Sequence, residues 1–197
     1  MEVEGEQFLR RKFLHLFQSY QHTRPGVVIQ EDAKIHGEQL DNILRKQLQS
    51  RGMSNDLVEQ RVEEFNAGWL RPAFAYFSEM VKFSKNPEAI SEDEFVQFKM
   101  SIRDYIRENG VLPPWFENSL RMSYEKCWAN DKGLLTEDSM ELLPGVTSGI
   151  KSVCHQHLTE NNNKTIDLVT FLCYVKDFYC NEDPNHVSKF IHGYVEQ

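Results

Sequence analysis

The feature that most constrains the fold is one pattern that recurs at four places in the chain. At each place a stripe of apolar residues with helical spacing ends in a polar loop, and a branched apolar residue then precedes a new helix. The four apolar residues are Val28, Ile90, Leu135 and Ile166. After the second of them, Ser91 and Glu94 can form a capping box, which marks a helix start. Thr136 and Asp167 are good N-caps after the third and fourth. The pattern predicts helices joined in pairs by short, ordered loops.

The stretches between these loops have the periodicity of amphipathic helices. Leu9, Phe13, Leu16 and Phe17, for example, share one helix face. Strand-like alternation is almost absent, so the sequence predicts an all-α fold. The expected helices include a short sixth one that ends at Pro144-Gly145 and a last one capped by Asp183-Pro184.

The loops fit the frame of an EF-hand, which is a twelve-residue loop between two helices with glycine at position 6 and an apolar residue at position 8. The four loops would be Gln21–Asp32, Phe83–Glu94, Trp128–Ser139 and Thr159–Thr170. Gly26 and Gly133 fall at position 6 of the first and third loops. The position-8 residues should pair across loops, Val28 with Ile90 and Leu135 with Ile166.

With this order of elements the sequence resembles the sarcoplasmic calcium-binding proteins, a family similar to the coelenterazine-binding and photoprotein EF-hand proteins. The resemblance covers nearly the whole chain. It includes the long segment that ends in Trp69 and the terminal Asp177-Phe178-Tyr179 with its tail. It implies two EF-hand pairs, residues 1–109 and 110–197, in one compact body. It also implies a C-terminal helical tail that packs back over the two lobes.

The loops depart from the family where calcium would bind. Calcium takes six to eight oxygen ligands, with acids at several loop positions and a bidentate acid at position 12. Only Asp32 and Glu94 remain in the first two loops, and both are expected to serve as helix-start charges. We therefore expect no calcium at cytosolic levels and no other cofactor. The residual metal candidates are Asn161, Asn163 and Asp167 of the fourth loop.

The composition and charge limit which classes of partner and which cellular compartment are expected. A net charge of −8 argues against a nucleic-acid backbone or an anionic membrane as the main partner. No apolar run approaches the roughly 18–20 residues of a membrane span, and the N-terminus is acidic rather than basic. The four cysteines lack a C-x-x-C spacing and are expected to be buried thiols. These features predict a cytoplasmic protein without a membrane span.

The many aromatic residues have two interpretations. They can simply fill the core, since they lie on helical stripes. They can also line a lipophilic cavity between the lobes, which the likeness to coelenterazine-binding proteins implies. The candidates for such a lining are Trp69, Phe74, Phe77, Trp115, Phe116, Tyr124 and Trp128.

Two further motifs indicate other chemistry only weakly. His155 and His157 are two residues apart, so a helix would point them to different faces, whereas metal ligands favour a spacing of three or four. The segment from Gly145 to Ser152 is similar to a phosphate-binding loop but has one residue too many before Lys151, and no strand precedes it. A turn between two helices fits it better.

Three functions therefore stay open. The first is a non-catalytic binding or scaffold protein for a protein partner or a lipophilic small molecule. The second is a weak calcium buffer or sensor with one residual site. The third is an enzyme of the juvenile hormone diol kinase type, because those kinases resemble the same EF-hand family.

Overall fold

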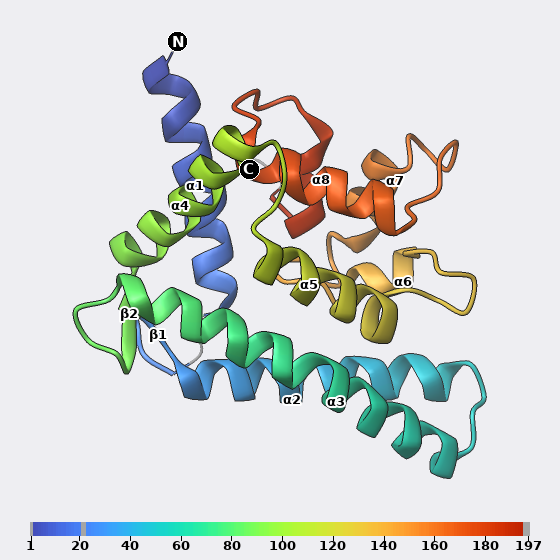
Figure 1. The fold of residues 1–197 in the computed structure, drawn as a ribbon. Helices are drawn as coiled ribbons and strands as arrows, with labels where there is room; N and C mark the ends of the chain where they lie inside the picture. The colour runs from blue at the N-terminus through green and yellow to red at the C-terminus, as the bar shows by residue number, and fades with distance from the viewer. Residues whose placement is uncertain (1, 21–22, 195–197) are drawn as a thin grey trace.

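The computed structural model describes residues 2–20 and 23–194, and its elements are almost all helices, as expected. Figure 1 shows the helices, which are α1 Glu2–Tyr20, α2 Gln30–Ser50, α3 Asn55–Met80, α4 Glu92–Asn109, α5 Pro114–Ser123, α6 Glu137–Met140, α7 Lys151–Leu158 and α8 Leu168–Cys180. Three shorter turns complete them: the 3-10 turns η1 Val81–Phe83 and η3 Val187–His192, and the π-helical turn η2 Tyr124–Trp128. Two short strands, β1 Val27–Ile29 and β2 Ala89–Ser91, join the first two loops.

The loops pair as the position-8 residues predict. Strands β1 and β2 run antiparallel, with Val28 opposite Ile90. In the second half, the amide of Leu135 donates to the carbonyl of Ile166 at 2.9 Å and makes a single bridge. All four side chains are buried, so each pair of loops is fixed to the core from inside.

Local signals set the helix boundaries near these loops. The Ser91 hydroxyl accepts from the Glu94 amide while the Glu94 carboxylate accepts from the Ser91 amide, which is the predicted capping box. The side chains of Thr136 and Asp167 accept from amides in the first turns of α6 and α8. Helix α4 ends at Gly110, whose φ of 73° is left-handed.

The two halves of the chain share one core. Helix α1 packs against α4, α4 packs against α8, and α3 packs against α5 and η2. Phe13 of α1 contacts the rings of Phe178 and Tyr179 in α8 at centroid distances of 6.1 and 5.6 Å. In Figure 1, α2 and α3 form a long antiparallel hairpin along one side of this body. The division at residue 109 stays a prediction.

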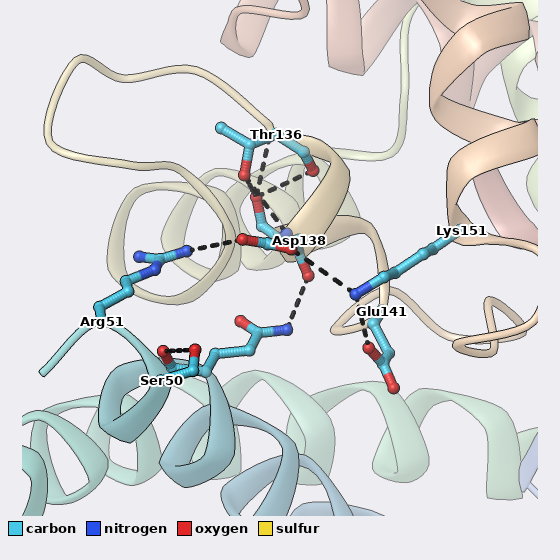
Figure 2. A network of polar contacts seen from close by, with 8 residues as sticks. Ser50, Arg51, Thr136, Asp138, Glu141 and Lys151 are labelled. Carbon is cyan, nitrogen blue, oxygen red and sulfur yellow. Dashed lines mark hydrogen bonds and ion pairs between the residues drawn. The ribbon is translucent and has the colours of Figure 1, made fainter.

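A surface network ties the end of α2 to the second half (Figure 2). Asp138 lies at its centre, where its carbonyl accepts from the Gln47 side chain at 2.8 Å and its carboxylate meets Arg51 at 3.3 Å. Lys151 of α7 lies 3.6 Å from Asp138 and 3.2 Å from Glu141. Exposed ion pairs contribute about 0–1 kcal/mol each, so the network orients these elements more than it stabilises them.

The sixth helix is shorter than predicted, since it ends at Met140 rather than at Pro144-Gly145. The amides of Leu142 and Leu143 bond to carbonyls three residues back, in turns instead of a helix. Proline disfavours the helical conformation of the residue before it, so α6 cannot extend to Pro144.

The tail also differs from its prediction. It is the 3-10 turn η3, and His186 caps it. The Asp183 carboxylate instead accepts from the amide of Asn185 in a separate turn, so the helical turn begins later than Asp183-Pro184 suggests.

The cysteines follow their prediction only in part. Cys127 and Cys154 are buried, but Cys173 is exposed and Cys180 is half-buried. Cys173 lies on the outer face of α8, where a helix that covers a core on one side meets solvent. Within the described residues, no helix is long and apolar enough to span a bilayer.

Candidate functional site

The acid at position 12 of the first loop bonds to its own loop. One oxygen of Asp32 accepts from the Thr23 amide at 2.8 Å, and the other accepts from the Ile29 amide at 2.7 Å. The side chain is 1% exposed. In a calcium-binding loop, the two oxygens of this acid would both coordinate the metal, whereas here they close the loop around its own amides.

Glu94 repeats the arrangement in the second loop. One oxygen accepts from the Lys85 amide at 3.0 Å, and the other accepts from the Ser91 amide at 3.0 Å and the Ser91 hydroxyl at 2.8 Å. The Ser91 amide, followed by the Lys85 amide and the Ser91 hydroxyl, lowers the pKa of Glu94 to about 2. Because the folded pKa lies below the ordinary one, this carboxylate stabilises the fold above about pH 4.5 and loses that effect as the pH falls toward 2.

The third loop has no carboxylate at the five side-chain ligand positions. At position 3, the Asn130 side-chain oxygen accepts from the amides of Lys132 and Leu134 at 2.9 and 3.1 Å. At position 12, the Ser139 hydroxyl accepts from the Thr136 amide at 2.9 Å. Trp128 at position 1 is buried in the core. The turn is thus held by neutral side chains, and Gly133 adopts a φ of 72° at its position 6.

The fourth loop takes a different shape. Glu160, Asn161 and Asn162 have successive φ values of 50°, 59° and 67°, which are left-handed. The Asn163 side chain donates to the Glu160 carbonyl at 2.8 Å, and Asp167 accepts from the Thr170 amide at 2.8 Å. That amide is the main cause of a lowered pKa of Asp167. The candidates Asn161, Asn163 and Asp167 all lie exposed on this loop.

The donors in the loops do not fit calcium. Each loop offers at most one carboxylate at the ligand positions, whereas calcium sites use several charged oxygens. Within residues 2–20 and 23–194, no three side chains of His, Cys, Asp or Glu lie together as a metal site. What remains of each loop is its turn, its position-8 contact and its helix cap.

A cavity that is partly open to solvent is walled by elements of both halves of the chain. The volume that the centres of water molecules can occupy in it is about 100 Å³, so it has room for several waters. The apolar wall includes Leu16, Val28, Phe77, Met80, Phe116 and Leu120. Concave, mostly apolar spaces with a few polar groups are the usual form of small-molecule sites.

The polar part of the wall centres on Lys99 of α4, which is 1% exposed. Its ammonium donates to the hydroxyl of Tyr179 at 3.0 Å and to the hydroxyl of Tyr76. It also lies 4.8 Å from the ring centre of Tyr76 and 4.9 Å from that of Phe95. Burial holds the pKa of Lys99 well below its usual value.

Two histidines complete the polar wall. His192 of η3 bonds through Nδ1 to the carbonyl of Pro144 at 3.2 Å, and burial lowers its pKa to about 3. His36 of α2 is buried, with its ring 5.5 Å from that of Tyr20. The tail and the helices thus both contribute to the wall of the cavity.

Of the six predicted lining residues whose side chains the structure describes, three reach the cavity, namely Phe77, Phe116 and Trp128. Phe74 does not, because it follows Ala73 on the helix and turns to the solvent, with 38% of its surface exposed. Trp115 instead stacks on Phe98, with 6.2 Å between the centres of the two rings. The Tyr124 hydroxyl lies near two loop carbonyls, those of Gly133 and Ile166. The Trp69 side chain lies outside the described part of the structure.

The sequence interpretation missed Lys99, Tyr76, Tyr179 and the histidines. One signal could have found Lys99, because it lies four residues after Phe95 and three before Ile102, on the apolar face of α4. A charge on such a face marks either a buried pair or a binding site. The contributions from the tail could not be found this way, since they depend on tertiary packing.

The two weaker motifs have structural roles. The ring of His157 stacks on that of Phe190 at 4.1 Å, which fixes η3 to α7. The segment from Gly145 to Ser152 is a turn that leads into α7, and the ammonium of its Lys151 is engaged by Glu141 and Asp138.

Helices in pairs, with their loops joined at position 8, are the arrangement of EF-hand proteins. Among solved structures, the chain is similar to a sarcoplasmic calcium-binding protein from amphioxus, with 11% identity, a TM-score of 0.55 and 95% and 98% of the two chains covered. It is also similar to the calcium-loaded apo form of the coelenterazine-binding protein from Renilla muelleri, with 16% identity, a TM-score of 0.58 and 98% of each chain covered. The predicted likeness is confirmed in fold, and at these identities it shows the fold alone. No family model and no curated protein matches the sequence.

Proposed function

We propose that this chain is a non-catalytic binding protein that takes a lipophilic small molecule into its cavity without calcium. One observation carries the proposal: aromatic and aliphatic side chains from both halves of the chain line a common apolar space. A fold neighbour is named for binding coelenterazine, which supports a ligand of lipophilic character. An open space in a core lacks the packing contacts that would otherwise stabilise it, and a ligand would supply them.

Independence from calcium is supported by the loops. Asp32 and Glu94 direct both of their carboxylate oxygens to loop amides. The paired loops are held by Val28 with Ile90 and by Leu135 with Ile166. The loop geometry that other EF-hands obtain from the metal is thus provided by hydrogen bonds and burial. The protein would hold one conformation at any calcium concentration.

The test is the binding of Nile red, a neutral lipophilic dye that fluoresces in apolar surroundings. We expect saturable binding with the same affinity in excess chelator and in millimolar calcium. Binding that requires calcium would favour a calcium sensor instead, and the absence of binding in both conditions would overturn the proposed cavity function.

A pair of substitutions on α3 locates the dye. Ala73 lines the cavity, whereas Ala75 is exposed on the same helix. Ala73→Trp should weaken binding at least about 10-fold by filling the space, at a stability cost of about 1–3 kcal/mol. Ala75→Trp should bind as the parent protein does. Equal binding by both variants would place the dye elsewhere. Circular dichroism before each titration verifies that both variants are folded.

A further inference from the structure

The cavity wall has an unusual charge composition for this chain. The protein has 30 acidic residues against 22 lysines and arginines, yet no aspartate or glutamate among the residues that the structure describes lines the cavity. Hydrogen-bond donors in the wall include the ammonium of Lys99, the hydroxyls of Tyr20, Tyr76 and Tyr179, and the indole of Trp128. The other polar side chains there are those of His36, Ser119, Ser123 and His192. A wall of this kind suits an acceptor with negative charge.

Lys99 lacks the partner that buried lysines usually have. Within the described residues it forms no ion pair, and its ammonium bonds only to the two tyrosine hydroxyls. A buried charge is costly unless an opposite charge and hydrogen bonds compensate it. The aromatic rings around Lys99 offset part of this cost. An anion in the cavity would offset the rest.

The geometry leaves donors available for such an anion. The hydroxyls of Tyr76 and Tyr179 accept from Lys99 and also hydrogen-bond to each other, so one of their two hydrogens stays available for another acceptor. Trp128 is 5% exposed, and its indole N–H has no hydrogen-bond partner within the described residues. Buried donors without a partner are rare in folded proteins, and a ligand acceptor would satisfy this one.

We propose that the ligand is a small amphiphilic acid, with an apolar body along the aliphatic wall and a carboxylate held by Lys99 together with Tyr76 and Tyr179. This inference rests on the proposed function of the cavity and names the chemical class of its ligand. Charge-assisted hydrogen bonds to Lys99 would bind the carboxylate, and the apolar chain would replace water against Phe77 and Phe116.

The test compares octanoic acid with 1-octanol by calorimetric titration at neutral pH in excess chelator. The two probes share one chain length, and only the acid is ionised under these conditions. We expect the parent protein to bind octanoate at least about 10-fold more tightly than octanol, as charge-assisted bonds of this kind would produce. Equal affinities would overturn the inference but leave the proposed function intact. If neither probe binds and Nile red does not bind either, both fail.

Substitution assigns the preference to one side chain. Lys99→Met keeps the length of the side chain and removes the charge, and it should reduce octanoate affinity about 10-fold or more while octanol affinity stays within about 3-fold. Lys132→Met makes the same change at an exposed lysine of the third loop and should alter neither. An undiminished octanoate preference in Lys99→Met would contradict the assignment. The comparison in the parent protein needs no variant, so the inference stays testable even if Lys99→Met folds poorly.

Discussion

Replacing Phe171 with alanine is expected to lower the free energy of unfolding by about 3–5 kcal/mol. Phe171 is fully buried in α8, where its ring lies 5.1 Å from that of Tyr124 and 5.5 Å from that of Trp128. These contacts join α8 to the π-helical turn η2. Removing the ring would leave a cavity that the two remaining aromatics cannot fill, and urea denaturation followed by circular dichroism would measure the loss.

A matched control lies two residues earlier on the same helix. Val169 is 67% exposed, so Val169→Ala should change the free energy of unfolding by no more than about 0.5 kcal/mol. Similar losses in the two variants would mean that α8 does not pack as described. If Phe171→Ala lowers the free energy of unfolding by less than about 1 kcal/mol, Phe171 is not packed in the core as described.

Alanine at Gly145 or Gly193 is expected to lower the free energy of unfolding by about 2–5 kcal/mol, through left-handed strain and overpacking. The two glycines have φ values of 86° and 69°. Gly145 lies close to the backbone of His192, and Gly193 lies close to the backbone of Gly145. A Cβ on Gly145 would overlap the His192 carbonyl oxygen, and a Cβ on Gly193 would overlap the Gly145 carbonyl oxygen. Backbone atoms cannot move aside as a side chain can, so the tail would detach locally.

Detachment of the tail has its own signature. His192 lines the cavity, so either variant should also weaken Nile red binding and expose η3 to proteolysis. Gly149→Ala is the control, because its Cβ would meet nothing nearer than 3.9 Å, and it should match the parent protein. Unchanged stability and proteolysis in both Gly145→Ala and Gly193→Ala would show that the tail does not close on this turn.

The fold could be predicted because each helix carries its own signal. The apolar stripes and the Ser91–Glu94 capping box are local features, and the structure has both. The loop pairing was predictable as well, since EF-hand loops pair at one position. The tail was only partly predictable, because the turn at Asp183 and the contact between Gly145 and Gly193 depend on how distant segments meet.

The sequence allowed a cavity as one interpretation of its aromatic residues, but it did not show which residues form the wall. A sequence stripe shows that Phe77 or Phe116 faces inward, yet a filled core and an empty one produce the same stripe. Of two adjacent residues, Ala73 lines the cavity and Phe74 faces the solvent, and only the packed helix shows which is which. Lys99 is the exception, because a charge on an apolar face was visible in the sequence.

Calorimetric titration of calcium into metal-stripped protein would show whether the loops bind the metal. Hydrogen bonds from Asp32 and Glu94 to their own loops stand where metal coordination would be. We therefore expect no stoichiometric heat at micromolar calcium and no change in thermal stability, because a ligand stabilises only the state that it binds. A micromolar, stoichiometric heat with a rise in melting temperature would contradict this expectation.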